Sequence, residues 1–283
     1  APVSSLRALC GNLSQADYRK EVLTMNQSER RLFLIQSLLR ERPSCQKQTI
    51  PTDSERQKIL LRGLMNVRNP HPISPEFLET QDTYLWEETA QKGITDIRDL
   101  PPMQPGLYLW QGDITTLKCD AIVNAANSGL TGCYIPNHRC IDNAIHTYAG
   151  VELRLACEAI IKAQGHPEPT GRAKITPAFN LPCKYVLHTV GPIIGSQVTD
   201  RDKALLASCY RSCLELAAMY DLESVAFCCI STGEFHFPND LAAEIAVGTV
   251  KEFLKQQTSV KKVIFNVFKD LDRQIYRRLL GEN

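Results

Sequence analysis

The sequence predicts an α/β fold in which a mixed, mostly parallel sheet is covered by helices on both faces. The first observation is that short apolar runs alternate with amphipathic helical patterns after residue 106, as is typical of parallel sheets. The second is that the pattern before residue 99 is helical only. The chain therefore divides into a helical N-terminal extension with its linker, residues 1–100, and an α/β domain, residues 101–283. A length of 283 residues suits two such units.

The N-terminal extension contains two predicted helices. Apolar residues form a broad stripe along Tyr18–Arg40, and Ser54 is a favoured N-cap for a second helix that ends at Asn66. The dipeptide Ser74-Pro75 is expected to break the chain, and Phe77–Lys92 mixes polar and aromatic residues without a clear assignment. Asp99–Pro102 is then the linker.

The α/β domain alternates strands with helices. The predicted strands are Leu107–Trp110, Ala121–Val123, Lys174–Ala178, Tyr185–Val190, Ser224–Ile230 and Lys262–Val267. The predicted helices are Ile141–Ala149, Leu153–Gln164, Asp202–Tyr220, Leu241–Leu254 and Leu271–Leu280. Ligands of such sheets bind beyond the carboxyl ends of the strands, so the residues after each apolar run are the candidate site.

Composition excludes several classes of protein. Lys plus Arg (32) nearly equals Asp plus Glu (31), which argues against a broad nucleic-acid or membrane footprint. No run of 18 apolar residues occurs that could span a bilayer. The 11 cysteines are odd in number and spread along the chain, which is typical of buried thiols in a reducing compartment and predicts a cytoplasmic location.

Four loops at strand ends are rich in Gly, Asn, Ser and Thr. They are Gln111–Thr115, Asn124–Cys140, His188–Pro192 and Ser231–Pro238. Such residues tolerate tight turns and present backbone N–H groups. The chain has no G-x-G-x-x-G, Walker A or HExxH sequence, so a nicotinamide dehydrogenase or a P-loop NTPase has little support.

One of these loops contains Cys133, His138 and Cys140 within eight residues. Thiolate and imidazole are ligands that zinc prefers, and three protein ligands with one open position are typical of a catalytic zinc site. Spacing alone leaves two other interpretations. The residues are ordinary cysteines and a surface histidine, or His146 or Cys119 adds a fourth ligand and makes the zinc structural.

Five ordered motifs resemble the signature of the macrodomain family over about residues 106–281. They are Gln111-Gly-Asp-Ile-Thr115, Asp120-Ala-Ile-Val-Asn-Ala-Ala-Asn127, Asp142-x-Ala-Ile-His146, Tyr185-Val-Leu-His-Thr-Val-Gly-Pro192 and Ser231-Thr-Gly-Glu-Phe235. The resemblance implies a three-layer α/β/α macrodomain that binds ADP-ribose. Hydrolytic members usually have a glycine-rich stretch before the Asp-x-Ala-Ile-His helix, where this chain has Cys133–Cys140. That departure resembles the zinc-dependent branch, whose members also carry a small helical N-terminal extension.

The resemblance implies a role for each nucleotide-binding residue. The Asp113 carboxylate accepts a hydrogen bond from the adenine amino group, and the Ile114 amide also contacts the base. The alternative is that Asp113 only caps a turn. Phe268 flanks adenine or belongs to the core.

The loop Ser231-Thr232-Gly233-Glu234-Phe235 is expected to wrap the diphosphate with backbone N–H groups, and Phe235 to stack on the distal ribose. Glu234 faces solvent or assists proton transfer near the zinc.

Asn127 and Asp142 are the expected catalytic residues. In relatives the residue matching Asn127 contacts the distal ribose, the one matching Asn124 organises the loop, and the one matching Asp142 lies by the scissile bond. Asp142 is also expected to N-cap its helix, and His146 to be a packed helix residue.

Together these features predict a zinc-dependent mono-ADP-ribosyl-protein hydrolase with one Zn²⁺ per chain. Its expected partners are ADP-ribose and a mono-ADP-ribosylated protein, and neither nucleic acid nor a membrane. Two alternatives use the same pocket, an ADP-ribose reader without turnover and an O-acetyl-ADP-ribose deacetylase. Two roles for the zinc stay open at this point: it activates a bound water molecule, or it orients the distal ribose.

Overall fold

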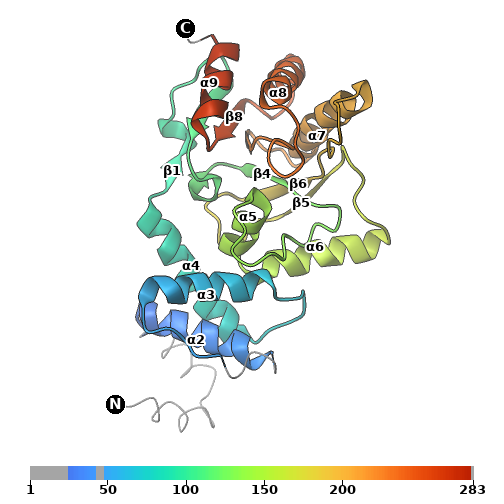
Figure 1. The fold of residues 1–283 in the computed structure, drawn as a ribbon. Helices are drawn as coiled ribbons and strands as arrows, with labels where there is room; N and C mark the ends of the chain where they lie inside the picture. Colours follow the sequence, from blue (N-terminus) through green and yellow to red (C-terminus); the bar gives the residue numbers. More distant parts are fainter. Residues whose placement is uncertain (1–24, 43–47, 282–283) are drawn as a thin grey trace.

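The computed structural model describes residues 25–42 and 48–281, and a six-stranded sheet lies at its centre (Figure 1). Its strands are β2 (Leu107–Gln111), β4 (Ala121–Ala125), β5 (Ala173–Pro177), β6 (Tyr185–Thr189), β7 (Ser224–Phe227) and β8 (Lys262–Val267). The strand order is β2-β8-β7-β4-β6-β5, and every neighbouring pair is parallel except β5 with β6. The predicted mixed, mostly parallel sheet is therefore confirmed.

Helices cover the sheet on both faces and complete the three predicted layers (Figure 1). On one face lie α7 (Asp200–Met219), α8 (Asn239–Phe253) and α9 (Asp270–Leu279). On the other lie α5 (Ile141–Ala149) and α6 (Val151–Gln164). The central strand β4 is buried between these layers, with four of its residues in the core. Its carboxyl end leads into the loop that holds the three predicted zinc ligands.

The N-terminal helices form a smaller, second hydrophobic cluster. They are α2 (Gln27–Arg40), α3 (Ser54–Asn66) and α4 (Pro75–Lys92). Leu34, Leu61 and Phe77 are buried at its centre, and Val151 of α6 belongs to the same cluster. The chain then pairs β1 (Thr95–Asp96) with β3 (Leu117–Lys118) and includes two 3₁₀ helices, η3 (Ile97–Asp99) and η4 (Ile114–Thr116). The division of the chain at residue 100 remains a prediction.

Helix starts in the N-terminal segment differ from those predicted. Helix α2 begins at Gln27, because the Asn26 side chain accepts from the amide of Glu29 and the Glu29 side chain bonds back to Asn26. The prediction of one continuous helix from Tyr18 is therefore wrong, because Asn26 is an N-cap and interrupts it. Residues 18–24 lie outside the described residues. In α3 the N-cap is Asp53, which accepts from the Arg56 amide at 2.8 Å.

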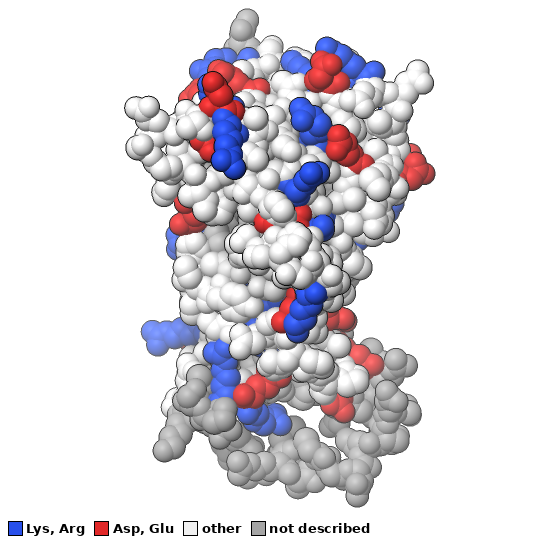
Figure 2. All heavy atoms as spheres, turned by 90° about the vertical axis from the view of Figure 1, so that its right-hand side faces the viewer, with Lys and Arg blue, Asp and Glu red and all other residues white. Residues whose placement is uncertain are grey.

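No helix in the described ranges is both long and apolar enough to cross a bilayer. On the face that Figure 2 shows, Lys and Arg side chains are interspersed with Asp and Glu, and no large patch of one sign covers it. The near balance of charge in the sequence is thus also a local balance on this face.

Candidate functional site

The three predicted zinc ligands converge in the loop between β4 and α5. The ligand atoms of Cys133, His138 and Cys140 all lie within 4.8 Å of one another, and Cys133 Sγ is 3.6 Å from His138 Nδ1. Zinc bonds of ~2.0–2.3 Å in a tetrahedron place ligand atoms roughly 3.5–4 Å apart, so this donor set suits the ion. All three residues are half-buried, and burial, with a contribution from Cys133, raises the pKa of the Cys140 thiol. The group can therefore hold a zinc ion that solvent reaches.

Neither candidate for a fourth protein ligand joins this group in the described part of the chain. The Cys119 thiol is buried and donates to the Ala121 carbonyl at 3.2 Å. His146 instead groups with Cys157 and His188. A closed, structural zinc that uses His146 or Cys119 is not supported by this arrangement.

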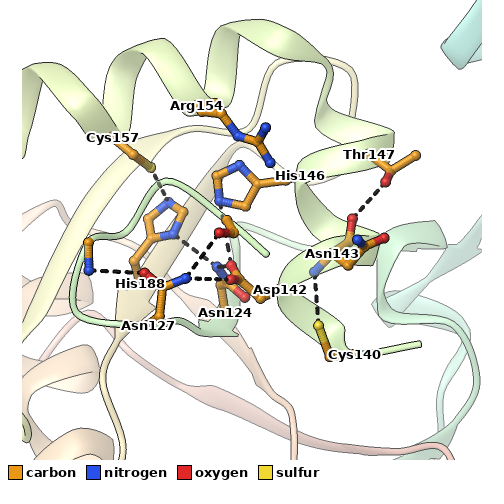
Figure 3. Close-up of polar contacts among 12 residues, drawn as sticks. Asn124, Asn127, Cys140, Asp142, Asn143, His146, Thr147, Arg154, Cys157 and His188 are labelled. Carbon is orange, nitrogen blue, oxygen red and sulfur yellow. Dashed lines mark hydrogen bonds and ion pairs between the residues drawn. The ribbon is translucent and has the colours of Figure 1, made fainter. Parts of the chain in front are cut away.

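Asp142 lies at the centre of a buried amide–carboxylate network (Figure 3). Asn124 Nδ2 donates to Asp142 Oδ1 at 2.8 Å, and Asn127 Nδ2 donates to Oδ2 at 3.3 Å. Burial raises the pKa of Asp142 to about 6, although the Asn124 hydrogen bond and the Arg154 charge act in the opposite direction. The two asparagines fix the position of the carboxylate. Asn124 and Asp142 are buried, whereas Asn127 is exposed to solvent.

The predicted N-cap role of Asp142 is wrong. Cys140 is the N-cap of α5, and its Sγ accepts from the Asn143 amide at 3.4 Å. Asp142 is instead the second residue of the helix, which turns its side chain toward Asn124 and Asn127. A predicted metal ligand thus also begins the helix that carries the predicted catalytic carboxylate.

His188 extends the network on the inner side. It is fully buried, and burial lowers its pKa to about 3, so the imidazole is neutral. Asn124 Nδ2 lies 3.2 Å from His188 Nδ1, and Thr176 Oγ1 lies 2.9 Å from Nε2. Because the Asn124 amide nitrogen can only donate, Nδ1 accepts and Nε2 carries the proton toward Thr176. His188 thereby holds the Asn124 side chain in the orientation that serves Asp142.

The second cluster of possible metal ligands, His146, Cys157 and His188, is less suited to a cation than the first. His188 Nε2 already bonds Thr176, and the Arg154 guanidinium lies beside the His146 ring, where its charge helps burial lower the pKa of His146. A neighbouring positive charge opposes a bound cation. His146 is buried and packed, in agreement with the sequence-based interpretation.

The loop Ser231–Phe235 is shaped to present amide groups. Ser231 takes a left-handed conformation with φ +65°, and its buried hydroxyl lacks a hydrogen-bond partner among the described residues. In the same ranges the amides of Gly233, Glu234 and Phe235 have no backbone acceptor. Thr232 and Phe235 are half-buried, whereas Gly233 and Glu234 are exposed. Free amides at a turn are suited to an anion.

Glu234 connects this loop to residues 133–140, which carry the three predicted zinc ligands and are called the metal loop below. Its carboxylate Oε1 lies 3.6 Å from His138 Nε2, although the side chain is 68 % exposed. Since His138 Nδ1 faces Cys133, the two ring nitrogens face different partners. The interpretation of Glu234 as a solvent-facing side chain alone is incomplete.

Asp113 does cap a turn. Its Oδ1 accepts from the amide and the hydroxyl of Thr115 at the start of η4, and its Oδ2 accepts from Lys92 Nζ at 3.1 Å. Burial favours a higher pKa for Asp113, but the hydrogen bonds from Thr115 and Lys92 outweigh it, and the net pKa is lowered. Ile114 is buried behind this turn. Phe268 follows β8 and is 77 % exposed, so its assignment to the core is wrong.

Comparison with known proteins identifies the family. The Macro domain family model matches residues 123–246. A protein-ADP-ribose hydrolase from Treponema medium is 60% identical over 91% of this chain and 100% of its own length. The chain belongs to the Macro domain family. A protein-ADP-ribose hydrolase from Staphylococcus aureus strain MSSA476 is 51% identical over 92% of this chain and 98% of its own length.

Solved macrodomains share the fold. One from Oceanobacillus iheyensis, solved with ADPR, is 41% identical with a TM-score of 0.57 and covers 62% of this chain and 91% of its own. One from Trypanosoma brucei, solved in complex with ADP, is 29% identical with a TM-score of 0.61 and covers 79% of this chain and 96% of its own.

Sequence reasoning missed several side chains around the site of this macrodomain. Lys92 at the end of α4 pairs with Asp113 and lies over the Tyr148 ring, 3.3 Å from its centroid. Arg62 and Asn66 of α3 contact the metal loop. These residues are distant in sequence from their partners, so no local motif reveals them.

Proposed function

We propose that this macrodomain is a zinc-dependent hydrolase that removes a single ADP-ribose from a protein side chain. One Zn²⁺ is held by Cys133, His138 and Cys140. The relatives named protein-ADP-ribose hydrolase, at 60% and 51% identity over most of the chain, support hydrolysis of ADP-ribosylated protein. The macrodomain structures with ADPR and ADP support the nucleotide as the ligand.

The position of the metal loop is the observation that carries the proposal. On one side Asn127 Nδ2 donates to the Gly132 carbonyl and to Asp142, so the loop adjoins the proposed catalytic residues. On the other side His138 faces Glu234 of the proposed diphosphate loop. A zinc ion here would lie between the loop Ser231–Phe235, which is proposed to bind the diphosphate, and Asn127 and Asp142, which are proposed to act at the distal ribose.

Binding energy from the nucleotide would place the distal ribose at this junction. Asp113 and the Ile114 amide would receive adenine, with Phe268 beside it. The free amides of Ser231–Phe235 would receive the diphosphate, and Phe235 the distal ribose. Contacts remote from the reacting carbon are worth several kcal/mol when they position that carbon.

The reaction is hydrolysis at C1 of the distal ribose. The bond from C1 to the side-chain heteroatom breaks, a water oxygen bonds to C1, and a water proton leaves with the side chain. Asn127 and Asp142 would orient the attacking water, and Asp142 would accept the proton that then passes to the leaving heteroatom, so that the other proton stays on the new C1 hydroxyl. Zinc, when bound, would supply a Lewis acid beside the ribose.

Chelation of the full-length protein tests the proposal. We expect metal removal to abolish hydrolysis of a mono-ADP-ribosylated protein, zinc to restore it, and the ADP-ribose Kd to change little. Cys140→Ala should behave like the chelated protein while remaining folded by circular dichroism. Full turnover in metal-free protein would overturn zinc dependence.

The same assays separate the alternatives. Zinc-loaded protein that binds ADP-ribose tightly but never turns over would be a reader. Faster hydrolysis of O-acetyl-ADP-ribose than of modified protein would identify an esterase. Unfolding of Cys140→Ala would indicate a structural zinc.

A further inference from the structure

Helix α3 of the N-terminal segment lies directly against the proposed metal loop. The Arg62 guanidinium donates to the backbone carbonyl of the ligand His138 at 3.1 Å. It also donates through two nitrogens to Asn143 Oδ1, at 2.8 and 3.2 Å. One side chain of α3 thus joins the metal loop to the first turn of α5.

Asn66 makes the second connection, one helical turn further along α3. It is 1 % exposed, its Oδ1 accepts from the Asn137 amide at 2.9 Å, and its Nδ2 donates to Thr147 Oγ1 at 3.0 Å. Asn137 itself is in the left-handed region, with φ +56°. Asparagine adopts this region readily, and the Asn66 hydrogen bond fixes the Asn137 backbone at this turn.

Gly63, which lies between Arg62 and Asn66, allows α3 to approach the metal loop closely. Gly63 lies on the same side of α3, where an added Cβ would come within 3.0 Å of Asn137 Nδ2 and 3.7 Å of Pro136 Cβ. In α5, Asn143 Nδ2 donates to the Ile135 carbonyl at 3.0 Å. The backbone from residue 135 to residue 138 is therefore hydrogen-bonded by side chains of both α3 and α5.

We propose that α3 is a positioning element for the metal loop, with Arg62 and Asn66 as positioning residues that set zinc affinity. The inference rests on the proposed function, since it takes Cys133, His138 and Cys140 as the zinc ligands. The loop has no helix or strand of its own. Arg62 bonds the carbonyl of His138 and Asn66 bonds the amide of Asn137, so α3 sets where His138 lies relative to Cys140 at the start of α5.

Arg62→Ala in the full-length chain tests the inference, with Arg56→Ala as a matched control. Arg56 is an exposed arginine on the same helix. Outer-shell groups of metal sites typically change affinity by about 10–100-fold. We expect Arg62→Ala to lose about tenfold or more of its zinc affinity in competition with a chromogenic chelator. Amides 133–140 should also exchange hydrogen faster, while the ADP-ribose Kd stays close to that of Arg56→Ala.

The readouts separate the two proposals. Zinc affinity and loop exchange equal to those of Arg56→Ala would overturn the role of α3. If Arg62→Ala does not fold, Arg62→Lys, which keeps the charge but not the forked geometry, should show the same losses in smaller measure. Wild-type protein that takes up no more zinc than Cys140→Ala would overturn the zinc proposal instead, and hydrogen exchange alone would then decide whether α3 holds the loop.

Discussion

Glu234 lies in an exposed loop, yet its carboxylate faces the His138 imidazole. At 68 % side-chain exposure such a pair contributes roughly 0–1 kcal/mol to stability. A carboxylate partner, however, orients a metal-binding histidine and fixes its tautomer. We expect Glu234→Gln to lower zinc affinity by about tenfold at unchanged melting temperature. Glu244→Gln, an exposed glutamate of α8, is the control, and equal zinc affinity and turnover in both variants would leave Glu234 without a role.

Asp142 accepts a hydrogen bond on each carboxylate oxygen, from Asn124 and from Asn127. Asp142→Asn is nearly isosteric, but it turns an NH₂ group toward one of these donors and removes the acceptor of a proton. We expect kcat to fall about 10²–10⁴-fold with a small change in the ADP-ribose Kd. Single-turnover hydrolysis and calorimetric titration measure the two quantities. Wild-type kcat in this variant would contradict the catalytic assignment.

Residue types in one loop were enough to predict that three possible metal ligands group together. Cys133, His138 and Cys140 are close in sequence and close in space, because a short loop cannot separate them far. The partners Arg62 and Lys92 could not be predicted, because their contacts arise only when α3 and α4 pack against the α/β domain.

At the scale of the element, the turn at Gly191 supports the loop that begins at Ser231. A Cβ on Gly191 would lie only 2.0 Å from Ser231 Oγ. We expect Gly191→Ala to displace Ser231 and to weaken ADP-ribose binding by about tenfold, or 1.4 kcal/mol. Gly195→Ala is the control, since a Cβ there meets nothing within 4 Å. Calorimetry that finds the same ADP-ribose Kd in both variants would contradict the assignment of this loop to the diphosphate.

Helix α4 shows why one element was missed. Ser74-Pro75 was expected to break the chain, but Ser74 is the N-cap, accepting from the Phe77 amide at 3.2 Å, and Pro75 opens the helix. Proline at the first helical position lacks only an N–H that has no intrahelical partner. The mixed composition of Phe77–Lys92 follows from its neighbours, because buried Gln81 accepts from the Val151 amide at the start of α6.

At the scale of the whole molecule, alternating strands and helices predicted the layers but not the order of the strands. Strand β2 pairs with β8, which lies near the other end of the chain, and β5 runs antiparallel to β6. Strand order depends on which helices cross which face, and periodicity does not encode it. The N-terminal helices were predicted as a separate unit, whereas their contacts with the site depend on tertiary packing.

Asp120 joins three neighbouring strands at their starts and predicts how the molecule responds to acid. Its carboxylate precedes β4, accepts from the amide and hydroxyl of Ser224 at the start of β7, and pairs with Lys184 Nζ before β6 at 2.7 Å. Burial favours a higher pKa, but the Lys184 and Ser224 hydrogen bonds outweigh it, so the pKa of Asp120 is lowered. A lowered pKa means that the folded state holds this proton less tightly than the unfolded state does. The stabilisation is therefore complete above the unfolded value of about 3.9 and is lost as pH falls through the folded value.

We accordingly expect Asp120→Asn to lower the free energy of unfolding by about 1.5–3 kcal/mol at pH 7, because hydrogen bonds to a charged group are replaced by bonds to a neutral one. The difference in the free energy of unfolding between this variant and the wild type should become smaller as pH falls below about 4, where the wild-type carboxylate also becomes protonated. Urea unfolding followed by circular dichroism at pH 7 and at acid pH measures both. Asp200→Asn, whose side chain is 98% exposed, is the control for a charge change without this network. A difference that stays constant with pH would show that the charge of Asp120 does not hold the three strand ends together.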